Sequence, residues 1–230
     1  MRIHRFYVEK IPESNIVYLE SGEFRHLKVL RINKGDKIEI FDGKKSYKAE
    51  VLEIFKNRAK IKKLEKIAKP ELKTQIFILT TMPKRARADW LVEKACELGA
   101  TAITPLITER TVVIPKKGKL ERWKRIVIEA AKQCGRVSIT KIEEPKKLEN
   151  INFENYDLKL LCAKDGLKPE EIKEKGEKIA LAIGPEGGFT KLEEDFLIEK
   201  GFIKMRLAAF DLRTETAALA ALTVVSLKYG

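Results

Sequence analysis

The chain lacks long apolar runs and an apolar leader. No run of about 18 apolar residues, the length that spans a membrane, occurs in its 230 residues. The N-terminal stretch MRIHRFYVEKIPES has no hydrophobic core of the kind that a secretory signal peptide needs. We therefore expect a cytoplasmic protein with no membrane span.

Cysteine and histidine are scarce. The three cysteines, Cys96, Cys134 and Cys162, lie far apart without C-x-x-C spacing, so we expect them to be reduced and no structural zinc to be present. With only His4 and His26, a Ser-His-Asp site or a histidine-rich metal site has little to build on. The sequence also contains neither G-x-G-x-x-G nor G-x-x-x-x-G-K-[ST], which removes the usual signals for dinucleotide and P-loop phosphate binding.

Positive charge, in contrast, is abundant. The net charge is +13, and residues 1–70 carry +8 of it, with 18 of the 47 Lys and Arg against 10 of the 34 Asp and Glu. Such a concentrated excess favours a polyanionic partner, with RNA foremost. The alternative is a solvated Lys/Glu-rich surface of the sort common in heat-loving organisms.

The chain divides into two domains by its rhythm. Residues 1–69 carry short β-like runs between turn signals and one short amphipathic helix at Glu23–Arg31, which predicts a small antiparallel β-barrel. The segments Asn33–Asp36 and Asp42–Lys45 read as hairpin connections. On this domain Arg5, Arg25 and Arg31 are candidate phosphate contacts.

Residues 70–230 alternate strand and helix patterns, which predicts an α/β domain around a mostly parallel sheet. The expected strands are Thr74–Thr80, Ala102–Pro105, Leu158–Cys162, Ile179–Ile183 and Phe202–Leu207. The expected helices are Ala88–Leu98, Leu120–Cys134, Pro169–Glu174, Lys191–Lys200 and Thr214–Lys228.

The stretch KIALAIGPEGGFT (178–190) is the strongest local signal. A buried strand stops at Gly184-Pro185, Gly187-Gly188 leave the backbone bare, and Thr190 with Glu193 has capping-box spacing. Strand, glycine turn and capped helix together indicate a ligand loop at the carboxyl end of a parallel strand. The alternative is a turn that uses its glycines for geometry only.

A second loop, LRTETA (212–217), joins a strand end to the last helix. Backbone N–H groups at that helix start can bind a ligand carboxylate, and Thr214 or Thr216 can cap it. The alternative is a capped helix with one structural Arg–Glu pair. Because both loops leave the carboxyl ends of strands, we expect them to converge on one site. A weaker group of polar residues comprises Glu109–Thr111 and, at helical spacing, Glu129, Gln133 and Arg136.

Several motifs together resemble a known family. They are AIGPEGGFT followed by Glu193, LRTETA, EAAKQCGR, VEKACELGA, and HLKVLR with the later GD and FDG. Through them the chain resembles the bacterial small-subunit (16S) ribosomal RNA uracil-N3 methyltransferases of the SPOUT superfamily. The resemblance implies a PUA-like β-barrel over residues 1–69 and a SPOUT α/β domain with a deep trefoil knot over residues 70–230. It also implies S-adenosyl-L-methionine as cofactor, and a homodimer whose site lies at the subunit interface.

The resemblance assigns the cofactor pocket to three segments. They are Leu161, Cys162 and Ala163, then Ile183, Gly184, Pro185, Glu186, Gly187 and Gly188, and finally the segment Leu207–Ala217, in which Leu207, Leu212, Thr214, Thr216 and Ala217 are the named candidates. One departure stands out, because the family's Leu-Gly-x-Arg-Ile-Leu-Arg reads Leu-Ala-Ala-Phe-Asp-Leu-Arg at residues 207–213.

The function that follows is methyl transfer to N3 of an unpaired or flipped uridine in ribosomal RNA, free or in the assembled small subunit. Arg213 is the candidate that stabilises the anionic uracil, with Arg110 or Arg136 reaching in from the second subunit. Glu215 is either the general base or the group that orients Arg213. An inactive PUA-type RNA-binding protein and a SPOUT ribose 2′-O or tRNA methyltransferase remain alternatives.

Overall fold

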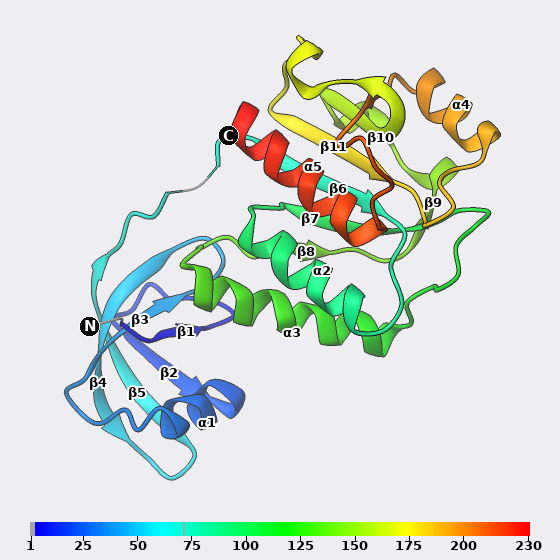
Figure 1. Ribbon diagram of the computed structural model, residues 1–230. Helices are drawn as coiled ribbons and strands as arrows, with labels where there is room; N and C mark the ends of the chain where they lie inside the picture. The colour runs from blue at the N-terminus through cyan, green and yellow to red at the C-terminus, as the bar shows by residue number, and fades with distance from the viewer. Residues whose placement is uncertain (1–2, 71) are drawn as a thin grey trace. The chain divides into compact units, whose positions relative to one another are not determined.

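The computed structural model describes residues 3–70 and 72–230 (Figure 1). The chain forms two compact units, one of Met1–Glu71 with Ala131–Ile139 and one of Leu72–Ala130 with Thr140–Gly230. A single cut near residue 70 therefore does not describe the chain completely, because Ala131–Ile139 belongs with the N-terminal unit. No local pattern in that segment signals where it packs.

The first unit is a five-stranded sheet with one helix. Its elements are β1 (Arg5–Tyr7), β2 (Ile16–Glu20), α1 (Ser21–Val29), β3 (Lys37–Phe41), β4 (Ser46–Ile54) and β5 (Arg58–Lys66). The strand order is β1-β3-β4-β5-β2. The predicted helix is confirmed as α1, and Asp42–Lys45 forms the predicted β3–β4 hairpin.

Two details of the expected barrel are wrong. The pair β1–β3 is parallel, whereas the other pairs are antiparallel, and among the described residues no pairing joins β1 to β2 to close the sheet. The sheet is therefore a PUA-like half-barrel. The chain passes through β2 and α1 between β1 and β3, and such a crossover permits the parallel β1–β3 pair.

The expected hairpin at Asn33–Asp36 is also wrong, because this segment connects α1 to β3.

Alternation along the strands builds the core of this unit. Phe6, Ile38, Ile40 and Ile61 are completely buried, and α1 adds Leu27 on the same side. Along β5, Lys60 and Lys62 on either side of Ile61 are more exposed, whereas Glu39 between Ile38 and Ile40 is buried, so part of the second face of the sheet is covered as well.

Arg5 is part of this interior. Its Nε donates to Glu39 Oε1 at 2.8 Å, its Nη2 donates to the Arg136 carbonyl at 2.7 Å, and its Nη1 donates to the Ala131 carbonyl. Its guanidinium also lies 4.3 Å from the centre of the Phe41 ring. The expectation that Arg5 contacts RNA phosphate is therefore corrected, because this side chain is buried and its donors are used within the unit.

The partner carboxyl is held in its charged form. Burial raises the pKa of Glu39, but hydrogen bonds from Ser46, Arg5 and Lys69 and the charge of Arg5 outweigh it, so the pKa lies below its ordinary value. Lys69 Nζ lies 3.1 Å from the second oxygen, Oε2. Arg5 and Glu39 thereby fasten segment Ala131–Ile139 to the half-barrel.

The second unit is the expected α/β domain. Its strands are β6 (Gln75–Thr80), β7 (Ala102–Ile107), β8 (Lys141–Ile142), β9 (Lys146–Lys147), β10 (Leu158–Leu167), β11 (Lys178–Ile183) and β12 (Ile203–Met205). Its α-helices are α2 (Ala86–Glu97), α3 (Lys117–Cys134, whose last turn belongs to the first unit), α4 (Lys191–Glu199) and α5 (Thr214–Tyr229). Short 3₁₀ turns occur at Leu148–Asn150, Phe153–Asn155 and Pro169–Glu171, the last in place of the helix expected at Pro169–Glu174.

All strand pairs of this sheet are parallel, and the main order is β12-β10-β11-β6-β7-β8, which confirms the predicted sheet type. Strand β10 runs five residues beyond the expected end at Cys162, with an irregularity before Leu167 pairs with Met205. A Cβ on Gly166 would lie 2.6 Å from the backbone of Lys204, so this close approach requires glycine.

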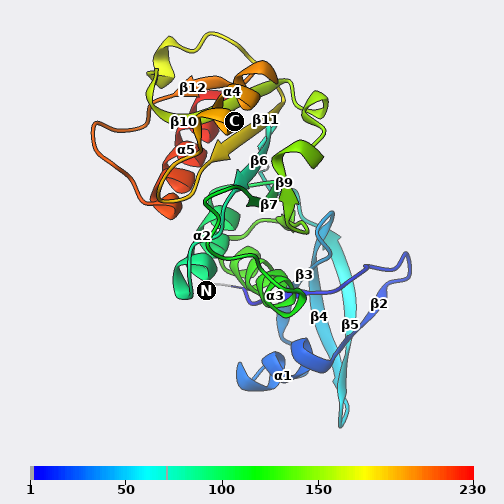
Figure 2. The same cartoon turned by 90° about the vertical axis from the view of Figure 1, so that its right-hand side faces the viewer.

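Helices cover both faces of the sheet (Figures 1 and 2). Helix α5 packs against β6 and β11 and also against α2. A second cluster joins alternate residues of the strands, such as Leu161 and Ala182, to Leu197 of α4 and to Phe153 and Phe202. Strands β6 and β11 are apolar over Ile76–Leu79 and Ile179–Ile183, because helices cover both faces of the sheet at these residues. Within the described part of the chain no helix has the length and apolarity to span a bilayer.

Replacing Arg5 should lower the unfolding free energy of the first unit. In Arg5→Met the buried Glu39 loses its main counter-charge, and breaking a buried pair costs about 3 kcal/mol or more of unfolding free energy. Urea unfolding at pH 7, followed by circular dichroism, measures the loss. The loss should shrink in acid, since the charged Glu39 contributes fully above the ordinary pKa of about 4.3 and ceases to contribute as pH falls through its lower folded-state pKa.

The matched control is Arg25→Met, because Arg25 is exposed on α1 and should change the unfolding free energy by no more than about 0.5 kcal/mol. Equal stability of the two variants would show that Arg5 does not hold the unit together.

Candidate functional site

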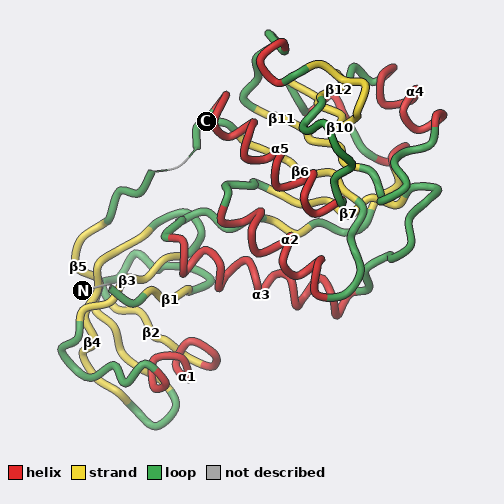
Figure 3. Tube along the Cα trace, in the orientation of Figure 1, coloured by secondary structure: helices red, strands yellow, loops and turns green. Residues whose placement is uncertain are grey.

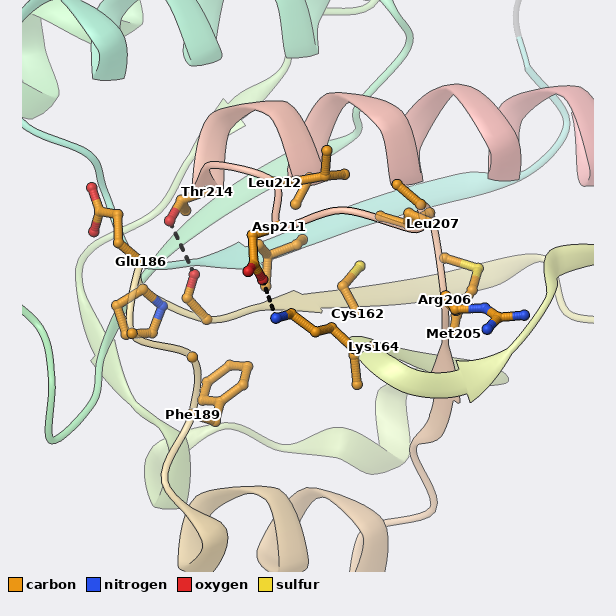
Figure 4. A pocket seen from close by; sticks show the side chains of 18 of the residues that line it. Cys162, Lys164, Glu186, Phe189, Met205, Arg206, Leu207, Asp211, Leu212 and Thr214 are labelled. Carbon is orange, nitrogen blue, oxygen red and sulfur yellow. Dashed lines mark hydrogen bonds and ion pairs between the residues drawn. The ribbon is translucent and has the colours of Figure 1, made fainter.

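The carboxyl ends of three neighbouring parallel strands, β10, β11 and β12, meet at one edge of the sheet. The segments that follow them surround a pocket of about 590 Å³ (Figure 4). Three groups of residues line it: Cys162–Asp165, Ile183–Phe189 with Glu194, and Met205–Ala208 with Phe210–Leu212, Thr214 and Ala217. The two loops singled out by the sequence therefore do converge.

The first wall is the loop after β11. Gly188 adopts φ +69° and donates its N–H to the Pro185 carbonyl at 2.8 Å, which closes a tight turn. A Cβ on Gly184 would lie 2.9 Å from the Phe189 nitrogen, so the loop can fold back only over a glycine. The glycines thus set the geometry and leave bare backbone beside the pocket.

Neighbouring elements hold this loop in place. Thr214 Oγ1 donates to the Gly184 carbonyl at 3.2 Å, and Arg110 Nη1 donates to the Gly187 carbonyl at 2.5 Å. The predicted Thr190–Glu193 capping box is present, and Glu193 Oε1 also accepts the Glu109 N–H at 2.8 Å. A loop held at so many points is preorganised for a ligand.

The start of α5 differs from expectation. Arg213 is the N-cap residue and makes no side-chain capping bond, so the predicted cap by Thr214 or Thr216 is wrong. The hydroxyl of Thr214 is used across the site, on Gly184. The first N–H groups of α5 consequently receive no side-chain acceptor from the N-cap residue.

The second wall is the segment Arg206–Arg213, which contains no helix or strand (Figure 3). Leu207 and Leu212 are half-buried against the pocket. Asp211 forms an ion pair with Lys164 of β10 across the pocket (Figure 4). Both partners are mostly exposed, so this pair positions the segment with little effect on stability.

Glu215 does not contact Arg213. Its buried Oε1 lies 3.5 Å from Arg87 Nη1, and the same Nη1 lies 4.0 Å from Glu186 Oε1 in the glycine loop. The other oxygen, Oε2, is buried without a hydrogen-bond partner among the described residues. Glu215 thus directs Arg87 of α2, whereas Arg213 is exposed.

Most of the expected cofactor residues line the pocket, but two do not. Leu161 is fully buried in the core beneath it, and Thr216 is exposed on α5. Beyond the expected segments, the pocket is also lined by Lys164, Asp165, Phe189, Glu194, Met205 and Arg206, which the sequence reasoning missed. The extension of β10 beyond Cys162 brings in the first two, and the apolar pattern gave no signal for it.

The remaining arginines occupy different settings. Arg25 and Arg31 are exposed on α1 and just after it. Arg136 is half-buried in the first unit, where its Nη2 donates to Ser138 Oγ at 2.9 Å. Arg110 holds Gly187 of its own chain.

Comparisons with known proteins agree with this architecture. The model of an RNA methyltransferase domain matches residues 70–226, and the model of an RNA methyltransferase PUA domain matches residues 19–64. Ribosomal RNA small subunit methyltransferase E from Buchnera aphidicola (subsp. Schizaphis graminum) is 34% identical over 100% of this chain and 98% of its own. The protein of that name from Aquifex aeolicus is 31% identical over 97% and 99%.

Solved structures match over the full length. Ribosomal RNA small subunit methyltransferase E from Neisseria gonorrhoeae, bound to S-adenosyl methionine, has a TM-score of 0.92 at 32% identity and covers 100% of this chain and 99% of its own. A putative methyltransferase from Legionella pneumophila, also with bound cofactor, has a TM-score of 0.90 at 29% identity, with 99% and 98% covered.

The thiol of Cys162 in the pocket wall should be unreactive. Desolvation raises the pKa of Cys162 to about 12, so about one molecule in 10⁴ carries the nucleophilic thiolate at pH 8. We expect N-ethylmaleimide to alkylate the exposed Cys134 at least about 100-fold faster, measured by mass spectrometry of peptides from the native protein. Comparable rates at the two cysteines would contradict the desolvated setting of Cys162.

Proposed function

Because the chain belongs to the ribosomal RNA small subunit methyltransferase E family, whose members join a PUA domain to a SPOUT-type RNA methyltransferase domain, we propose that it methylates N3 of a uridine in 16S ribosomal RNA. S-adenosyl-L-methionine is the methyl donor. The observation that carries the proposal is the pocket at the ends of β10, β11 and β12, walled by the glycine loop and segment Arg206–Arg213.

The pocket suits such a cofactor. Its volume of about 590 Å³ lies within the usual range of small-molecule sites. Ile183, Leu207 and Leu212 offer apolar contacts to a flat base, and the bare backbone at Gly187 and Gly188 offers polar groups without side chains. When bound there, the cofactor supplies an electrophilic methyl group.

The chain's own task is then positioning and charge. Uracil becomes anionic as it loses its N3 proton, and a guanidinium beside its carbonyl oxygens stabilises that charge. Arg213 is exposed at the start of α5, next to the pocket residues Leu212 and Thr214, and can serve there.

Glu215 acts indirectly, through Arg87. Its carboxylate is 4% exposed and faces Arg87, so it is a positioning residue for the Arg87 guanidinium and does not accept the uracil proton. Arg87 in turn reaches Glu186, so the ion pairs link α2 and α5 to the glycine loop.

The substrate must present an unpaired uridine, because a paired N3 is inaccessible. We propose that exposed Arg25 and Arg31 of the first unit contact flanking phosphates. We further propose that the protein is a cytoplasmic homodimer in which Arg136 reaches the site of the second copy. The proposal also includes a deep trefoil knot in the α/β domain.

Arg213→Ala should remove methylation and preserve cofactor binding. Loss of one charge-stabilising donor lowers kcat by about 10²–10³. Calorimetry with S-adenosylmethionine measures the binding, and digestion of 16S ribosomal RNA to nucleosides followed by mass spectrometry measures 3-methyluridine.

Arg213→Lys is the matched control, and it should retain part of the activity because it keeps the charge and loses the planar fork. Full activity of Arg213→Ala would dismiss the role. Methyl groups on ribose oxygens in place of uracil N3 would overturn the assigned reaction.

RNA affinity should fall steeply with salt. For single strands, log K decreases by about 0.7 per contacted phosphate for each unit of log salt concentration. Arg25→Gln and Arg31→Gln should each weaken binding and flatten this slope by about one contact. Filter binding of a 16S RNA fragment at several salt concentrations checks the slopes.

Lys191→Gln provides the comparison, since Lys191 is paired with Asp195 on α4 of the second unit. The same slope in all four proteins would exclude Arg25 and Arg31 as phosphate contacts.

A further inference from the structure

Phe210 is exposed to an unusual degree. Its exposed fraction is 83%, although phenylalanine is among the residues most often buried in folded proteins. The other phenylalanine of the pocket, Phe189, is 7% exposed and forms part of the wall. An aromatic ring that lines a pocket and yet stands open to solvent lies at the mouth of that pocket.

The segment that carries this ring borders the pocket. Phe210 sits on segment Arg206–Arg213, between the wall residues Leu207 and Leu212. Its neighbour Asp211 is joined to Lys164 of β10 across the pocket (Figure 4). This exposed pair links the backbone next to Phe210 to the opposite side of the pocket, which keeps the segment, and the ring that it carries, beside the pocket.

The side chains around the pocket mouth suit a nucleobase of an RNA strand. A flat, exposed aromatic ring offers a stacking face, and a nucleobase is the matching flat group. Arg206 and Arg213 at the two ends of the segment are both exposed and supply positive charge for an anionic strand. Apolar partners for the cofactor's adenine lie deeper, at Ile183, Leu207 and Leu212, which are buried or half-buried.

We propose that Phe210 stacks on the uracil ring of the target uridine and holds it at the mouth of the pocket. This inference rests on the proposed function and names the residue that receives the flipped base. A flipped base loses its stacking neighbours in the RNA, and an aromatic side chain in the enzyme replaces them. Phe210 is thus a substrate-binding residue.

The first test compares Phe210→Ala and Phe210→Trp on a short 16S RNA fragment. The alanine variant should raise KM for RNA by about 5–150-fold, the range of one lost base stack, and leave the affinity for S-adenosylmethionine unchanged. The tryptophan variant should restore KM. Leu227→Ala is the matched control, because Leu227 is equally exposed at 84% and lies on α5 outside the pocket lining.

The second test changes the substrate. A fragment with 5,6-dihydrouridine at the target position keeps the N3–H and loses the flat aromatic ring. The wild type should bind it about as weakly as Phe210→Ala binds the normal fragment, and Phe210→Ala should not distinguish the two fragments. Discrimination that survives in Phe210→Ala would overturn the contact with the target base.

Three further results would overturn the proposal. Equal RNA affinity of wild type and Phe210→Ala would show that Phe210 does not stack on the RNA. A loss of cofactor affinity in Phe210→Ala, parallel to the loss of RNA affinity, would show that the ring contacts the adenine of the cofactor. A change from dimer to monomer in analytical ultracentrifugation assigns it to a contact between two copies of the chain. Failure of the wild type to bind cofactor or methylate RNA would instead overturn the proposed function itself.

Discussion

The hydrogen bond from Thr214 to the Gly184 carbonyl joins the end of β11 to the start of α5, and the pocket depends on this junction. The two residues lie 30 positions apart, and α4, β12 and segment Arg206–Arg213 intervene. Bringing them together turns two strand ends into two walls of one pocket. The approach is possible because Gly184 lacks a Cβ, which would lie 2.9 Å from the Phe189 nitrogen.

The charged side chains around this junction differ in their burial. Glu215 is buried and faces Arg87, Arg87 is half-buried and approaches Glu186, and Arg213 is exposed. A buried carboxylate beside a guanidinium fixes that guanidinium in place, because moving it away would leave the charge uncompensated. The site therefore combines Glu215 and Arg87, which hold each other in place next to the glycine loop, with Arg213, which is exposed near the pocket mouth.

The first unit uses arginine in two ways that the sequence does not distinguish. Arg5 is enclosed with Glu39 and binds carbonyls of segment Ala131–Ile139, whereas Arg25 and Arg31 remain open. All three looked alike as basic residues of a basic segment. A guanidinium can serve as an internal fastener or as a phosphate contact, and burial decides which.

Local pattern determined much of this protein by itself. Apolar runs predicted the parallel strands, the Thr190–Glu193 spacing predicted the start of α4, and Gly187-Gly188 predicted a bare turn beside a ligand. These features rest on short-range steric and hydrogen-bond rules, so neighbouring residues suffice to specify them. The motifs also identified the family, because long matches in a fixed order seldom arise by chance.

Only the tertiary structure decided the rest. The partner of Glu215, the burial of Arg5, the parallel pairing of β1 with β3 and the passage of β10 past Cys162 all depend on residues distant in the chain. Phe210 likewise gained its meaning from its place at the pocket mouth, since no pattern in Leu-Ala-Ala-Phe-Asp-Leu-Arg indicates exposure. Which groups meet across a fold is set by the packing of whole elements, and that packing is not encoded in any single stretch of sequence.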